Sequence, residues 1–205
     1  MALKLASIFF TMILVDNYVL AKFLGICPFL GVSKKLDSAV GMSMAVTFVM
    51  VVATAATWPI YRLILVPAGM EGTARDMGYL QTIVFILIIA ILVQLLENVL
   101  KKYIPALYKS LGVYLPLITT NCTILGVTIL NIDNGYSFIE AIVCAAGAGI
   151  GFLVAMVLFS GVRRRVEQAV TPKCFEGLPI TLVAAAITSL SFMGFGGIVE
   201  SIFGA

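Results

Sequence analysis

Six long apolar stretches constrain the fold of this chain more than any other feature of its sequence. Each contains 18 to 24 residues, and a helix needs about 20 mostly apolar residues to cross the hydrocarbon core of a bilayer. We therefore expect an all-α, polytopic membrane protein in which residues 1–205 form a single integral membrane domain. The predicted spans are Leu3–Leu20, Ala39–Trp58, Tyr79–Leu100, Leu111–Leu130, Ile139–Val162 and Leu178–Val199.

The amino-acid composition agrees with a membrane environment and excludes several function classes. Hydrophobic residues make up 61% of the chain and charged residues only 11%, whereas a soluble domain has about 25% charged residues. The net charge of +3 is small and gives no reason to expect a nucleic-acid partner. Because the sequence contains no histidine, His-ligated haem, His-containing zinc sites and Ser-His-Asp catalysis are excluded within this chain.

One six-residue pattern, Cys-x-x-Leu-Gly-Val, occurs once in each half of the chain. The two copies are the first Cys segment, Cys27–Val32, and the second Cys segment, Cys122–Val127, which lie 95 positions apart. This offset indicates an internal duplication, with a first repeat over about 1–105 and a second over about 106–205. Thiolates are soft metal ligands and redox-active groups, so two cysteines in equivalent places indicate a site for chemistry as well as for packing.

The first and fourth spans are predicted to be broken helices. The first Cys segment directly follows span one. In span four, Pro116 and the polar run Thr119-Thr120-Asn121 precede Cys122. Irregular backbone at membrane depth is tolerated only where it is buried in protein or lines a cavity. We therefore expect Cys27 and Cys122 to lie near mid-depth and to face a partner or a site rather than lipid.

The distribution of basic residues predicts the orientation in the membrane. The positive-inside rule makes the connections after spans one, three and five cytoplasmic and leaves both termini outside. Because three spans per repeat is an odd number, the second repeat must enter the membrane from the opposite side. We therefore expect two inverted three-span repeats that bring Cys27 and Cys122 together at their interface. These connections hold ten of the 13 basic residues, namely Lys22, Lys34, Lys35, Lys101, Lys102, Lys109, Arg163, Arg164, Arg165 and Lys173.

Polar and small residues within the spans supply further candidates. Asp16 and Asn17 interrupt span one, and a polar or charged group inside a membrane is costly enough to indicate function. Coordination of an ion, a polar contact to a partner helix and a simple location at a helix end all remain open for this pair. Cys144 is predicted to pack in the core, and Cys174 is predicted to be a reduced loop thiol. The run Gly147-x-x-x-Gly151 predicts close helix packing rather than a nucleotide cradle.

Several longer motifs resemble one known protein family. Together they resemble the family of the A subunit of the Rnf complex, and the likeness covers nearly the whole chain. It extends to a paralogue, the E subunit of the sodium-pumping NADH:quinone reductase, although the sequence around the first cysteine is more similar to that of the Rnf subunit. The motifs are Cys27-Pro28-Phe29-Leu30-Gly31, Val32-Ser33-Lys34-Lys35, Leu115-Pro116-Leu117-Ile118-Thr119-Thr120-Asn121-Cys122 and Ser191-Phe192-Met193-Gly194-Phe195.

The resemblance implies a complex of the bacterial inner membrane that moves electrons between ferredoxin and NAD and couples them to translocation of Na⁺ or H⁺. It also implies an intramembrane [2Fe-2S] cluster shared with a homologous subunit of opposite topology, the Rnf E subunit. The ligands from this chain would be Cys27 and Cys122, and the other Rnf subunits would be further partners. Because the sequence has neither a dinucleotide fingerprint nor a ferredoxin-type cysteine run, we expect no direct NADH or ferredoxin binding.

The residues alone leave alternatives open. A [2Fe-2S] cluster commonly takes four thiolates, so two more must come either from a pseudo-symmetric partner or from a second copy in a homodimer. Cys27 and Cys122 could instead be small buried residues at tight helix breaks. A small secondary transporter or channel without a redox centre is a different class of function that also fits inverted repeats with broken helices.

Overall fold

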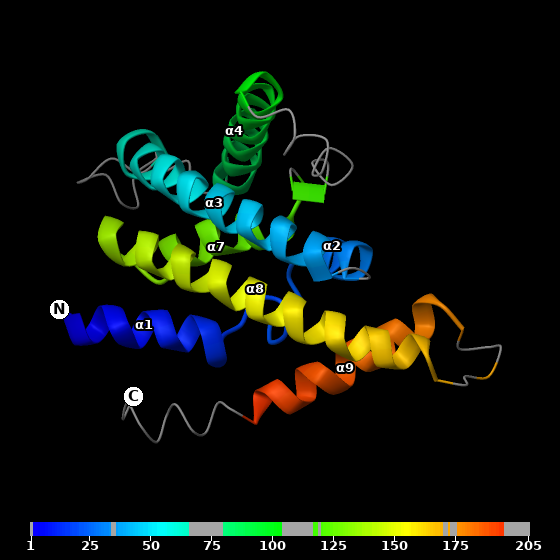
Figure 1. Cartoon of the computed structure of the whole chain (residues 1–205). Helices are drawn as coiled ribbons and strands as arrows, with labels where there is room; N and C mark the ends of the chain where they lie inside the picture. The colour runs from blue at the N-terminus through cyan, green and yellow to red at the C-terminus, as the bar shows by residue number, and fades with distance from the viewer. Residues whose placement is uncertain are drawn as a thin grey trace.

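The computed structural model describes residues 2–33, 36–65, 80–103, 117–118, 120–169, 172 and 176–194. These residues form helices, turns and loops, which agrees with the predicted all-α class (Figure 1). The α-helices within them are α1 Ala2–Leu14, α2 Ile26–Val32, α3 Leu36–Ile60, α4 Gln81–Tyr103, α7 Cys122–Asp133, α8 Phe138–Glu167 and α9 Leu178–Met193. A short π-helix, η1 Tyr61–Leu65, continues α3.

The centre of the molecule is a pair of long antiparallel helices, α3 and α8 (Figure 1). Gly149 of α8 lies against Thr47 of α3, and Trp58 near the end of α3 contacts Phe138 at the start of α8, with ring centroids 5.4 Å apart. Helix α8, with 30 residues, and α3 with the first residues of η1, together 28 residues, are long and apolar enough to cross a membrane. At about 1.5 Å of rise per residue, each exceeds the roughly 30 Å of a bilayer core.

Helix α1 packs along α8 through two glycines. A Cβ atom at Gly147 would lie 3.1 Å from the carbonyl oxygen of Phe9, and one at Gly151 would lie 2.9 Å from the carbonyl oxygen of Met12. Helices approach this closely where one of them lacks side chains at the contact. The packing face predicted for Gly147-x-x-x-Gly151 is therefore confirmed.

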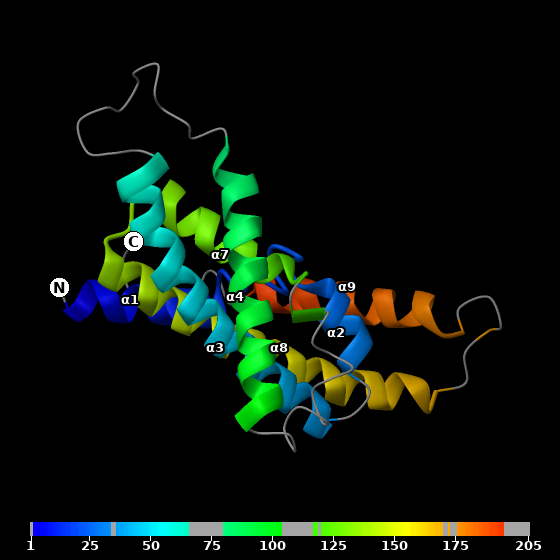
Figure 2. The same cartoon turned by 90° about the horizontal axis from the view of Figure 1, so that it is seen from above.

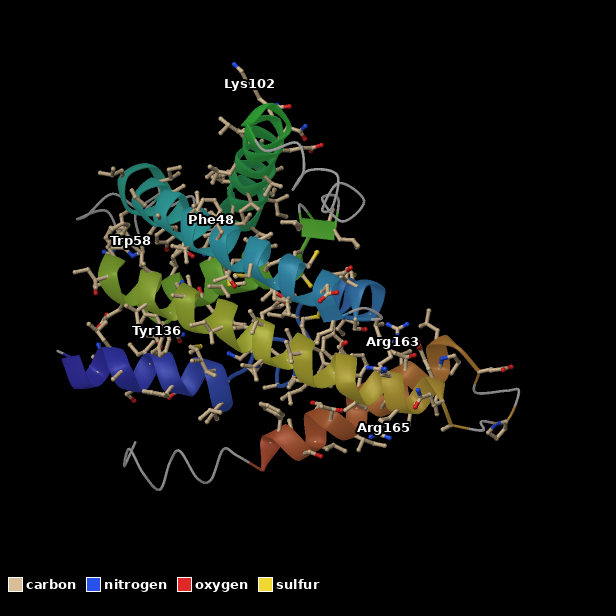
Figure 3. All side chains as sticks on the ribbon, in the orientation of Figure 1. Phe48, Trp58, Lys102, Tyr136, Arg163 and Arg165 are labelled. Atoms are coloured by element: carbon tan, nitrogen blue, oxygen red, sulfur yellow. The ribbon has the colours of Figure 1, made fainter. Side chains whose placement is uncertain are left out.

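Polar contacts distinguish the two ends of α8, and Figure 3 shows Trp58 and Tyr136 at one end and Arg163 at the other. At the N-terminal end, the Trp58 indole donates a hydrogen bond to the Tyr136 carbonyl over 3.0 Å. At the C-terminal end, Arg163 donates to the Ser33 hydroxyl over 2.7 Å, so the C-terminal end of α2 and the end of α8 lie together. The positive-inside rule predicts that the connections after spans one and five, which contain these two residues, are cytoplasmic, and the location of the termini outside stays a prediction.

The helices differ from the predicted spans at several ends. Helix α1 ends at Leu14 rather than Leu20, and α7 begins at Cys122 within predicted span four, of which residues 111–116 and 119 lie outside the described residues. Helix α9 ends at Met193, and residues 195–199 of span six are likewise not described. Figure 2 shows that α4 runs across α8 rather than along it. The six-span inverted repeat therefore stays a prediction.

Large apolar side chains face outward on several helices. The exposed fraction is 75% for Leu63, 69% for Leu190, 64% for Met44 and 63% for Ile83. Isolated exposed apolar residues are ordinary, but many of them spread over several helices indicate a membrane or partner surface. This pattern agrees with the hydropathy of the chain.

The tight contact between α3 and α8 gives a prediction for stability. A Cβ at Gly149 would lie 2.4 Å from the Cγ2 atom of Thr47, so Gly149→Ala is expected to lower the free energy of unfolding by about 1–3 kcal/mol through overpacking. Gly161→Ala on the same helix is the matched control, since a Cβ there meets nothing within 4 Å. Thermal unfolding of both variants in detergent measures the difference, and equal stability would contradict the tight packing.

Candidate metal centre at the junction of two broken helices

The break after α1 is organised by the side chain of Asn17. Its Oδ1 accepts the backbone N–H of Val19 over 3.1 Å, and its Nδ2 donates to the carbonyl oxygen of Gly151 over 2.8 Å. A side chain that bonds a nearby N–H group competes with the helical hydrogen bond of that group. Because Asn17 is buried, it turns the chain away from the axis of α1 and also ties the turn to α8.

Asp16 lies at the more exposed side of the same break. Its carboxylate is 44% exposed and lies 3.8 Å from the Nζ of Lys22. An exposed ion pair of this kind contributes little to stability. The observed contacts of Asn17 are internal to the chain. An ion path or partner contact at Asp16 and Asn17 stays a prediction.

The second break lies immediately before Cys122. Asn121 is the N-cap of α7, and its Oδ1 accepts the backbone N–H of Thr123 over 3.1 Å. Asparagine is a preferred N-cap because its side-chain oxygen satisfies an N–H group that has no partner within the helix. Cys122 is therefore the first residue of its helix, and Cys27 is the second residue of α2.

The two breaks are in direct contact with each other. The backbone N–H of Gly25 donates a hydrogen bond to the Sγ of Cys122 over 2.9 Å, across 97 positions of sequence. Gly25 has a left-handed backbone with φ of 81°, and a Cβ there would lie 2.1 Å from the Oγ1 of Thr123. Only glycine avoids both the backbone strain and the overlap. Because Cys27 follows Gly25 by two residues, the two Cys segments meet at this junction.

Both duplicated cysteines are free and exposed at the surface of the chain, whereas Cys144 is free and buried. Cys144 therefore packs in the core as predicted, and Cys174 lies outside the described residues. Both duplicated side chains are exposed in this chain, which does not fit the alternative that they are small buried residues, and their role as metal ligands stays a prediction. Within the described part of the chain, no group of three or more His, Cys, Asp and Glu residues could hold a metal ion.

Phe23 adds a strained, exposed aromatic residue next to this junction. Its backbone is left-handed, with φ of 54°, and the residue is 48% exposed. A bulky residue in this conformation costs about 1–3 kcal/mol, and such strain is concentrated at functional sites. The junction therefore presents two thiols and an apolar ring to the surroundings of the chain.

Helix α8 supports the first Cys segment through three side chains along its length. Phe152 lies 3.2 Å from where a Cβ of Gly25 would be, and Phe159 stacks on Phe29 of α2 with ring centroids 4.1 Å apart. Arg163, one turn further on, donates hydrogen bonds to Leu30 and Ser33. The geometry of the thiols is thus set by a long helix from the other half of the chain.

Sequence reasoning missed the roles of Gly25 and Arg163. Gly25 stands two positions before the repeated pattern, and nothing in its neighbours indicates a left-handed backbone. The positive-inside rule accounts for Arg163 only as part of a cytoplasmic basic cluster, together with Arg164 and Arg165. A buried partner for one of three consecutive arginines has no sequence signal.

Comparison with known proteins identifies the family of this chain. Residues 5–199 match the family model described as "Rnf-Nqr subunit, membrane protein". The A subunit of the "Na(+)-translocating ferredoxin:NAD(+) oxidoreductase complex" of Acetobacterium woodii is 53% identical over 95% of this chain and 98% of its own length. The A subunits of the "Ion-translocating oxidoreductase complex" are 53% identical in Syntrophotalea carbinolica, over 91% of this chain and 93% of that protein, and 52% identical in Serratia proteamaculans, over 92% and 94%. The chain thus belongs to the Rnf-Nqr family of membrane subunits.

Proposed function

We propose that this chain is the A subunit of an Rnf-type, ion-translocating ferredoxin:NAD⁺ oxidoreductase, and that it relays electrons across the membrane through a [2Fe-2S] cluster held by Cys27 and Cys122. Relatives named as A subunits of ion-translocating oxidoreductase complexes share about half of its residues over almost the whole chain, which supports the assignment to such a complex. The chain is therefore a subunit of an oxidoreductase and not an autonomous enzyme.

The contact between the two Cys segments is the observation that carries the cluster assignment. Gly25, two residues before Cys27, donates its N–H to the Sγ of Cys122 over 2.9 Å. An N–H group directed at a thiolate is suited to an iron-sulfur ligand, because hydrogen bonds to the sulfur atoms help to set the reduction potential. When bound, such a cluster supplies one-electron transfer.

The donor set fits half of a four-thiolate cluster. This chain contributes two exposed thiols at the junction, and its described residues contain no third or fourth ligand beside them. Exposure leaves the two thiols accessible to ligands from another subunit. We infer that the homologous Rnf E subunit supplies the other two thiolates, and that the exposed ring of Phe23 contributes to that interface.

Coupling to ion movement belongs to the same proposal. We infer that the two repeats adopt different relative arrangements in the oxidised and reduced states, and that this difference drives translocation of Na⁺ or H⁺ by the complex. The location is the bacterial inner membrane, with several spans and with both termini outside. The remaining Rnf subunits complete the path to ferredoxin and NAD⁺.

The experiment is to purify the full chain alone and together with the homologous E subunit, and to measure iron, sulfide and visible absorbance. The pair is expected to be brown, with about two iron atoms per pair, whereas the chain alone should hold no stable cluster. A stoichiometric cluster in a verified monomer would contradict the shared site. A colourless pair without iron would instead favour a transporter or channel without a redox centre.

A further inference from the structure

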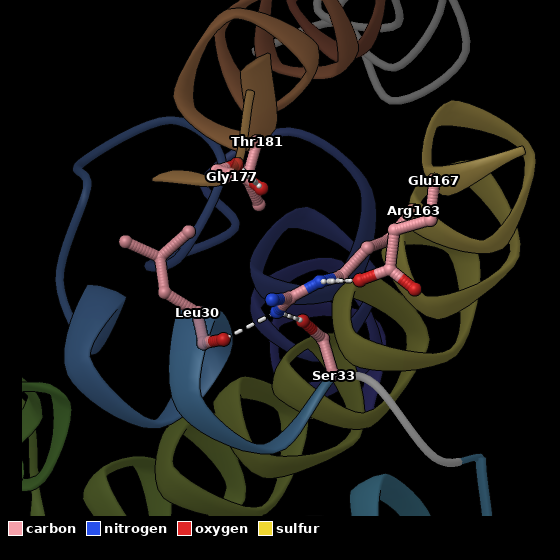
Figure 4. A network of polar contacts seen from close by, with 6 residues as sticks. All are labelled: Leu30, Ser33, Arg163, Glu167, Gly177 and Thr181. Carbon is pink, nitrogen blue, oxygen red and sulfur yellow. Dashed lines mark hydrogen bonds and ion pairs between the residues drawn. The ribbon is translucent and has the colours of Figure 1, made fainter. Parts of the chain in front are cut away.

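Arg163 is buried near the C-terminal end of α8 and reaches across to the end of α2. Its side chain is 10% exposed, its Nη1 donates to the Ser33 hydroxyl over 2.7 Å and to the carbonyl oxygen of Leu30, and its Nε donates to Glu167 over 3.1 Å (Figure 4). The two contacts at the C-terminal end of α2, to Leu30 and to the C-cap Ser33, lie 133 and 130 positions away in the sequence. A buried guanidinium with several partners is an anchor and not an ordinary surface charge.

Helix α2 needs such an anchor because it is very short. It has seven residues, whereas isolated helices below about 12–15 residues are marginal even with favourable sequences. The Leu30 carbonyl is one of the last four in the helix, which have no intrahelical donor, and a positive charge at a helix C-terminus is favourable. Arg163 supplies the donor and the charge together.

The position of Arg163 along α8 connects it to the thiols. Phe159 lies one turn before Arg163 and stacks on Phe29, with ring centroids 4.1 Å apart and planes inclined by 22°. The two residues therefore clamp one side and the C-terminal end of α2. Cys27 is the second residue of this helix, one turn before Leu30. A shift of the clamped end would move the thiol as part of the same short rigid unit.

We propose that Arg163 is a positioning residue for Cys27, which fixes α2 against α8 so that the first thiol stays beside the Cys122 segment. The effect of Arg163 on electron transfer rests on the cluster function proposed above, but the anchoring of α2 by Arg163 does not. Arg163 thus differs from its neighbours Arg164 and Arg165, which are exposed and are suited to the positive-inside role.

The anchor is tested first without any cluster, by the mobility of a nitroxide spin label on Cys27. The other three cysteines are replaced (Cys122→Ser, Cys144→Ala and Cys174→Ser) in the full chain. Arg163→Gln is expected to increase the mobile component of the EPR spectrum about tenfold, because a charge-assisted anchor is lost. Arg163→Lys should restore part of the immobile component, and Arg164→Gln is the matched control that removes a charge without touching α2.

Ser33→Ala keeps the test meaningful if Arg163→Gln does not fold. It removes one of the two α2 contacts and should raise the mobility of the label in the same direction but less. A spectrum of Ser33→Ala or of folded Arg163→Gln that superimposes on the unmodified background would overturn the anchor. So would an equal change in Arg164→Gln.

The second readout is the cluster itself, in the complex with the E subunit. Arg163→Gln is expected to shift the reduction potential and broaden the reduced-state EPR signal, whereas Arg164→Gln should leave both unchanged and Arg163→Lys should lie between them. Unchanged potential and line shape in Arg163→Gln would contradict the positioning role. If Cys27→Ser retains the cluster while the spin-label result holds, the assignment of Cys27 as a cluster ligand fails and the anchor stands.

Discussion

Cys27→Ser and Cys122→Ser are each expected to remove most of the iron from the proposed complex with the E subunit, and to abolish the reduced-state EPR signal of the proposed [2Fe-2S] cluster. Even partners that only orient a metal ligand change metal affinity by about 10 to 100-fold when lost, so loss of a ligand should cost at least tenfold. Both side chains are exposed, so serine should be accommodated without unfolding. The serine at position 122 also retains an acceptor for the Gly25 N–H.

Cys144→Ala is the matched control for this prediction. Cys144 is buried in α8 and is 0% exposed, so its removal should leave iron content unchanged. A small loss of stability is expected there because a buried sulfur atom is deleted. Iron is quantified per mole of complex, and electron transfer is followed from reduced ferredoxin to NAD⁺. Full iron and full activity in either serine variant would rule out that cysteine as a ligand.

Gly25→Ala, which adds a single methyl group, is expected to lower the free energy of unfolding strongly. A left-handed backbone costs a non-glycine residue about 1–2 kcal/mol, and overpacking adds about 1–3 kcal/mol. The overlap is severe, since the new Cβ would lie 2.1 Å from the Oγ1 of Thr123. We therefore expect a loss of about 2–5 kcal/mol in unfolding free energy, together with loss of most of the cluster, because relieving the overlap moves the N–H away from Cys122.

Gly31→Ala is the control for Gly25→Ala. Gly31 lies in α2, and a Cβ there would meet Leu117 at 3.8 Å, an ordinary van der Waals distance. Its substitution should leave iron content unchanged and stability within about 0.5 kcal/mol, as expected for changes away from strained or overpacked sites. Denaturation in detergent and iron analysis measure both variants. Equal behaviour of the two glycine variants would show that the left-handed turn is dispensable.

Much of the architecture is predictable because it depends on local pattern. Long apolar runs predict helices, and α3 and α8 are found where two of these runs lie. The glycines at 147 and 151 predict a close helix contact, because spacing by four residues places them on one helix face, and α1 packs there. The helix breaks are also indicated by local residues, since Asn17 and Asn121 bond nearby N–H groups in the way that asparagine commonly does.

The candidate site is predictable in its residue types but not in its construction. Duplication of the Cys segment is enough to identify Cys27 and Cys122 as a pair. The left-handed turn at Gly25 and its bond to Cys122 depend on residues 97 positions apart, and no local pattern encodes that contact. The exposed position of both thiols likewise depends on how the remaining helices pack.

The sequence by itself determined the membrane environment, the helical class and the choice of Cys27 and Cys122 as candidate ligands, because each follows from composition, periodicity or repetition along the chain. The tertiary structure decided which of three identical neighbours, Arg163, Arg164 and Arg165, reaches α2. Successive residues of a helix point about 100° apart, so only one of the three faces the adjacent helix. That face is set by the packing of α8 against α2, and Arg163 is the arginine that occupies it.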